Sequence, residues 1–150
     1  MSTGVPSVLI LRYSFVRRLA CDVRSQFDPR VHSNSNLPGT ASVQLHGVGG
    51  RTMTKLRLFD LHVVEQIAPD IVILEIGTND LVHKSPEVVG SKIESLVCLL
   101  IEAYNIHVVC VCLVIPRGHS NHGAASFFER VAILRHYLGV VLSPIPNVFC

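Results

Sequence analysis

Apolar residues along this chain follow two alternating patterns, which are short uninterrupted runs and longer stretches with helical spacing. Uninterrupted apolar runs are typical of strands that are buried on both faces of a parallel sheet. The runs predict strands at residues 7–11, 41–45, 71–76, 107–115 and from 147 onward, and the last of these is expected to be incomplete.

The helical spacing predicts a helix after each of the first four strands. These helices are expected from about residue 14, from 52 to the region before Pro69, from 85, and over 124–138. The third has the clearest start, because Ser85 is a good N-cap and is followed by a proline and a glutamate. On the last helix, the residues expected to face the core are Phe127, Phe128, Val131, Leu134 and Leu138.

Strands that alternate with helices predict an α/β protein, with a parallel sheet covered by helices on both faces. The chain has 150 residues, of which 49% are hydrophobic and 16% charged, so a single domain with a sizeable core is expected. The apolar stretch 106–115 is too short to span a bilayer. The short run 8–11 has no basic residue ahead of it, so no signal peptide is expected and a cytoplasmic location is predicted.

Cysteine usage and net charge indicate no disulfide framework, metal site or nucleic-acid partner. The five cysteines are odd in number and lack framework spacing. Cys110 and Cys112 share one face of a predicted strand, where we expect small buried apolar residues rather than metal ligands. A formal charge of +2 is too small to indicate nucleic acid as a partner. We expect no cofactor, and the sequence gives no indication of the oligomeric state.

The segment 69–81, PDIVILEIGTNDL, is the most informative part of the chain. Its apolar run ends abruptly in a Gly-Thr-Asn-Asp turn, as a buried strand does where it delivers polar groups to the edge of a sheet. Ligands of open α/β sheets bind at the carboxyl ends of the strands. The amide of Asn79 is therefore a candidate hydrogen-bond donor to a ligand, although an ordinary turn would have the same composition.

Two further motifs follow the first and second strands. Ser14 lies at the junction of the first strand and helix, where its hydroxyl suits a nucleophile and its N–H an oxyanion; a plain N-cap serine is the alternative. The segment 47–52, GVGGRT, lets the backbone approach a ligand closely, although it could be only a turn that needs positive φ. Together, Ser14, Gly50 and Asn79 form a nucleophile and a donor set of the kind that acyl transfer needs.

These three motifs resemble those of the SGNH hydrolases, also called GDSL-type esterases and lipases. The resemblance covers essentially the whole chain, and EIGTND is its most specific element. It implies a flavodoxin-like, three-layer α/β/α fold with a parallel sheet of about five strands. It also implies hydrolysis of a small-molecule acyl ester, with Ser14 as nucleophile and with Ser14 N–H, Gly50 N–H and the Asn79 side chain as oxyanion donors.

The chain departs from the family pattern in two places. Arg12-Tyr13 replaces the usual Gly-Asp before the serine, and the D-x-x-H that supplies the base is expected beyond the last strand, in a C-terminal part that is missing here. The string Asp80-Leu81-Val82-His83 overlaps the third motif and is interpreted as coincidence. His119 and His122, in the predicted loop 116–123, are interpreted as exposed loop residues rather than as a substitute base.

Three function classes remain open on the sequence. The first is an SGNH-type serine ester hydrolase that is impaired because its Asp/His block is absent. The second is a non-catalytic SGNH-like pseudoenzyme or binding module. The third is a flavodoxin-like binder of nucleotides or phosphate, which is disfavoured because no acidic ribose-binding residue follows at the expected position.

Overall fold

The computed structural model describes residues 4–12, 40–112 and 124–150. Within these residues the chain forms a five-stranded sheet in the order β2-β1-β3-β4-β5, and every neighbouring pair is parallel. The strands are β1 Ser7–Arg12, β2 Ser42–Gly47, β3 Ile71–Glu75, β4 Val108–Val111 and β5 Val148–Phe149. The predicted α/β class with a flavodoxin-like parallel sheet is confirmed.

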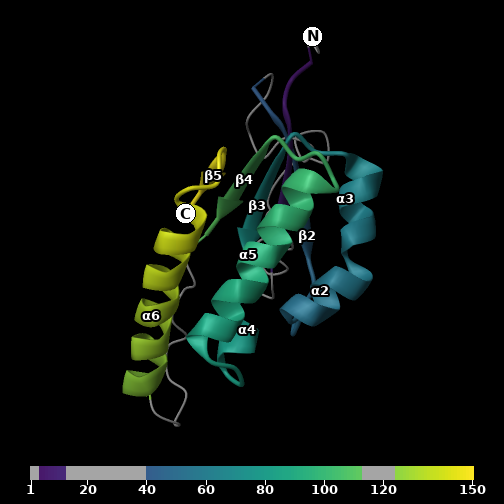
Figure 1. Cartoon of the computed structure of the whole chain (residues 1–150). Coiled ribbons are helices and arrows are strands. Elements are labelled where there is room, and N and C mark those ends of the chain that lie inside the picture. The colour runs from purple at the N-terminus through teal and green to yellow at the C-terminus, as the bar shows by residue number, and fades with distance from the viewer. Residues whose placement is uncertain (1–3, 13–39, 113–123) are drawn as a thin grey trace.

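Helices connect and cover the strands. The described helices are α2 Met53–Phe59, α3 Leu61–Ile67, α4 Thr78–Leu81, α5 Pro86–Glu102 and α6 Ala124–Leu142. In Figure 1, α5 lies against the sheet between α6 on one side and α2 and α3 on the other. The strand order changes direction at β1, between β2 and β3, so the carboxyl ends of these three strands form the switch point at which open α/β sheets bind ligands.

The core lies between the sheet and this helix layer. Alternate residues of the strands are almost fully buried there, including Leu9 on β1, Val72 and Leu74 on β3, and Val109 on β4. Residues on the opposite face, such as Ile73, are only half-buried. Helices α5 and α6 contribute their apolar stripes to the same cluster, so the described long helices form one layer on one face of the sheet.

Two expectations about the helices are corrected. The helix predicted from residue 52 to the region before Pro69 is two helices, α2 and α3, which are divided at Asp60. The apolar spacing continues across this break, so the pattern could not reveal it. On α6, Phe128 was expected to face the core but is 54% exposed, because the buried stripe runs through Val131 and Leu134 and Phe128 lies beside it.

Several boundaries also differ from the predictions, and some predictions fall outside the described residues. The fourth strand ends at Val111 rather than running to residue 115, although only Cys112 of the continuation is described. Helix α6 continues to Leu142, four residues past its predicted end. The helix expected from about residue 14 and the loop predicted at 116–123 lie outside the described ranges.

Candidate active site

The first motif is only partly described. Strand β1 ends at Arg12, while Tyr13 and the predicted nucleophile Ser14 lie outside the described residues. Arg12 is in register with Glu75 on the neighbouring strand, and the two side chains form an ion pair that is largely buried. Arg12, the first of the two residues that stand in place of Gly-Asp, therefore contacts the neighbouring strand β3.

Gly50 lies in the turn between β2 and α2, at the carboxyl edge of the sheet. Its φ of +71° is in the left-handed region that favours glycine. Gly50 is exposed, and a Cβ added to it would meet no described atom within 4 Å. Thr52 then accepts a hydrogen bond from Lys55 N at 3.4 Å and caps α2. The turn thus has the backbone freedom and the accessibility that an N–H donor to a ligand needs.

The buried carboxylate of Asp60 contacts one residue before this turn and one residue within it. Asp60 is 4% exposed, and its Oδ2 lies 3.0 Å from Arg51 Nε while its Oδ1 lies 3.3 Å from His46 Nε2. The Arg51 guanidinium also lies over the Phe59 ring, 5.2 Å from its centroid. Asp60 thus connects the end of β2 to the break between α2 and α3, and sequence reasoning did not identify this role.

Asn79 lies in α4, the short helical segment that directly follows β3. Gly77 precedes it with a φ of +102°, which turns the chain sharply out of the strand. Asn79 Nδ2 donates a hydrogen bond of 2.7 Å to the carbonyl oxygen of Arg51. The structure therefore brings Asn79 against the residue next to Gly50, so that the second and third predicted motifs meet.

Asp80 makes a second link between the same two loops. It is 1% exposed, and its Oδ2 accepts a hydrogen bond of 2.8 Å from Met53 N. Its Oδ1 lies 2.9 Å from Lys84 Nζ. Two consecutive residues after β3 thus hold residues 51 and 53 after β2. These contacts give Asp80 a structural role, while His83, the other end of the D-x-x-H string, is exposed.

The described residues hold no cluster of three or more histidine, cysteine or acidic side chains that could bind a metal ion. Cys98, Cys110, Cys112 and Cys150 are free thiols. Burial raises the pKa of the Cys110 thiol, and the nearby Cys112 raises it further. None of the helices in the described ranges is long and apolar enough to cross a membrane. His119 and His122 lie outside these ranges.

Comparison with known proteins gives structural matches alone. No family model matches the sequence, and no curated protein sequence matches it. A GDSL-like lipase from Bacteroides thetaiotaomicron matches with a TM-score of 0.65 and 16% identity, over 93% of this chain and 68% of that one. Axe2, an acetylxylan esterase from Geobacillus stearothermophilus, matches with a TM-score of 0.57 and 13% identity, over 95% and 76%.

A third match is LAE5, an alpha/beta hydrolase from the metagenome of Lake Arreo, with a TM-score of 0.66, 15% identity and coverage of 92% and 72%. The chain spans as little as 66% of the length of a matching structure. At identities this low, the matches show a shared fold and nothing more. The chain has the SGNH hydrolase fold that is found in GDSL-type lipases and esterases.

Proposed function

We propose that this chain is an SGNH-type serine ester hydrolase domain that acts on a small-molecule acyl ester. The observation that carries the proposal is the hydrogen bond from Asn79 Nδ2 to the Arg51 carbonyl. It brings the predicted oxyanion side chain to the residue that follows the predicted oxyanion glycine, at the carboxyl edge of the sheet. The matching esterase and lipase structures support the proposal through the fold.

The proposed chemistry is acyl transfer through Ser14. Its Oγ attacks the acyl carbonyl carbon and loses its proton to a base, while the carbonyl oxygen becomes an oxyanion. Ser14 N–H, Gly50 N–H and the Asn79 side-chain amide stabilise this oxyanion. Collapse releases the protonated alcohol and leaves an acyl-serine, and water then hydrolyses that ester to the acid and restores Ser14.

Ser14 also needs a base that accepts its proton. No D-x-x-H follows β5 within the 150 residues, and a serine without a base is a poor nucleophile. Removal of one member of a catalytic triad typically costs several orders of magnitude in kcat. We therefore propose that the 150-residue chain turns over esters slowly, and that a soluble base restores part of its reactivity.

The test is covalent labelling of the 150-residue chain by a fluorophosphonate, with and without added imidazole as the soluble base. We expect a single phosphonylated residue, Ser14, and faster labelling with imidazole. Ser14→Ala should abolish the label, and Asn79→Ala should slow it about a hundredfold, as loss of an oxyanion donor does elsewhere. Ser126→Ala, at an exposed position of α6, serves as the matched serine control.

A second candidate function, a non-catalytic binding module of the same fold, is favoured by one observation. Arg12 occupies a position where the family has glycine, and it forms an ion pair with Glu75. If the wild-type chain and Ser14→Ala react alike with the fluorophosphonate in imidazole, the hydrolase proposal fails and the binding module replaces it.

A further inference from the structure

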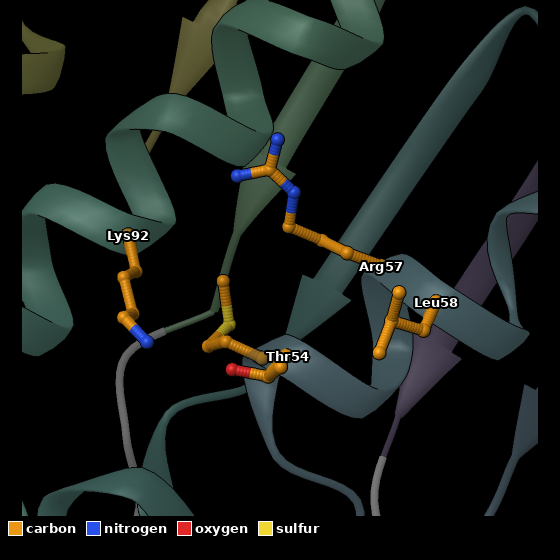
Figure 2. A pocket seen from close by; sticks show the side chains of 5 residues that line it. Thr54, Arg57, Leu58 and Lys92 are labelled. Atoms are coloured by element: carbon orange, nitrogen blue, oxygen red, sulfur yellow. The ribbon is translucent and has the colours of Figure 1, made fainter.

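A cavity lies between α2 and α5, on the helix layer. It has a volume of about 280 Å³ and is lined by Met53, Thr54, Arg57, Leu58 and Lys92. In Figure 2, Arg57 extends from α2 toward α5, and Lys92 projects from α5 on the other side, so that two cationic side chains border the same space. Arg57 Nη1 also donates a hydrogen bond of 3.3 Å to Ser95 Oγ on α5, which orients the guanidinium from α2 toward α5.

A third cationic side chain, Lys84, lies next to Lys92. The Lys84 ammonium lowers the pKa of Lys92, with desolvation and Arg57 acting in the same direction. Asp80 offsets part of this repulsion, but its two carboxylate oxygens already contact Lys84 and Met53 N. Lys84 and Lys92 thus lie near one carboxylate whose oxygens are engaged, and a bound anion would relieve the repulsion between the ammonium groups.

The other residues that line the cavity are two apolar side chains, Met53 and Leu58, and Thr54. Met53 is 1% exposed, and Leu58 is 70% exposed at the surface of α2. A ligand that fits these walls therefore has an apolar body that covers Leu58 and Met53, and an anionic group that reaches Arg57 and Lys92. The Thr54 hydroxyl can donate a further hydrogen bond to an anionic oxygen. Small-molecule sites commonly combine apolar walls with a few polar groups in this way.

One residue that lines the cavity, Met53, is linked to the loops of the candidate active site. Met53 follows Gly50 by three residues, and its N–H is held by Asp80, which directly follows Asn79. One wall of the cavity is therefore attached to both proposed oxyanion loops. A molecule bound there would be held on the same side of the domain as the chemistry assigned to those loops.

We propose that the cavity between α2 and α5 binds a small organic anion, with a phosphate or carboxylate group held by Arg57 and Lys92 and an apolar part over Met53 and Leu58. We assign this anion as part of the ester substrate, and this assignment rests on the proposed function. The binding itself rests only on the cavity and its charges.

The test is a titration of the 150-residue chain with butyl phosphate, followed by the NMR signal of Arg57 Nε–H and by calorimetry. We expect saturable binding that moves this signal, weakens with added salt, and does not occur with butanol, which lacks the anion. Replacement of Arg57 and Lys92 together by methionine should weaken binding about tenfold or more, because each side chain contributes a charge-assisted hydrogen bond.

Lys55→Met is the matched control, since it removes one positive charge from an exposed position of α2 that does not line the cavity. It should leave the affinity nearly unchanged. Absence of saturable binding, an affinity equal to that of the double methionine variant, or an equal loss in Lys55→Met would overturn the proposal.

Butyl phosphate titration and fluorophosphonate labelling of the wild-type chain together separate this proposal from the hydrolase proposal. Wild type should bind butyl phosphate even if labelling shows that Ser14 is unreactive. In that case the cavity remains an anion site and the substrate assignment is lost.

Discussion

Asp80 offers a quantitative test of how the two oxyanion loops are held together. Its carboxylate is almost fully buried and accepts the Met53 N–H at 2.8 Å. A hydrogen bond to a charged group contributes about 1.5–3 kcal/mol, and its removal leaves the buried N–H of Met53 without an acceptor. The ion pair with Lys84 adds about 0.5 kcal/mol, because the lysine side chain remains 32% exposed.

Asp80→Ala should therefore lower the free energy of unfolding by about 2–4 kcal/mol. With an m-value of about 2 kcal/mol/M, urea unfolding should show a midpoint that is about 1–2 M lower and a nearly unchanged slope. Asp80→Asn keeps an acceptor for Met53 N and loses only the charge, so its cost should be about half as large. Because Asn79 is adjacent, both variants should also slow fluorophosphonate labelling of Ser14.

Asp70→Ala is the matched control for this experiment. Asp70 Oδ2 accepts a hydrogen bond from Ser7 N that is also 2.8 Å long, but at the amino end of β3, and its side chain is 47% exposed. Its removal should cost about 1 kcal/mol or less and leave labelling unchanged. Equal urea midpoints for Asp70→Ala and Asp80→Ala, or equal costs for the alanine and asparagine variants at position 80, would refute the reasoning.

Two further predictions concern the helix layer. Gly90→Ala should destabilise the fold by about 1–2 kcal/mol despite the better helix propensity of alanine, because the added Cβ would lie 2.6 Å or less from two Tyr137 ring atoms; a thermal midpoint equal to or above that of wild type would contradict this. Lys92 should be acetylated faster than Lys55 by a limiting amount of acetylating reagent at pH 9, because its lowered pKa leaves more neutral amine. Lys84→Met should remove most of that difference in a peptide mass map, and an unchanged ratio would show that Lys84 is not its cause.

Much of the fold could be predicted because the apolar pattern differs between strands and helices. The runs at 7–11 and 71–76 correspond to β1 and β3, and the Ser85 cap correctly marks the start of α5, where its Oγ accepts a hydrogen bond from Val88 N. The break at Asp60 could not be predicted in this way. Asp60, at the break, contacts Arg51 and His46, and these contacts form only when the chain folds.

The same distinction applies to the candidate site, where positions could be predicted and contacts could not. The positions of Gly50 and Asn79 could be predicted, since each follows a strand and parallel strands end at a common edge. Three contacts could not be predicted: the hydrogen bond from Asn79 to Arg51, the ion pair between Arg51 and Asp60, and the hydrogen bond from Met53 N to Asp80. Each of them depends on how separate elements pack in the folded chain. The prediction for Ser14 stays a prediction until it is tested by labelling.

The contacts of the third motif, EIGTND, also explain why its presence does not by itself indicate activity. Gly77, Asn79 and Asp80 each have a structural reason for their identity: a φ of +102°, a hydrogen bond to Arg51 and a hydrogen bond from Met53. A chain of this fold that lost its catalytic base would still need these residues to hold the loop after β2. EIGTND is therefore expected in catalytic and non-catalytic chains alike, so the reactivity of Ser14, rather than the presence of the motif, distinguishes a hydrolase from a binding module.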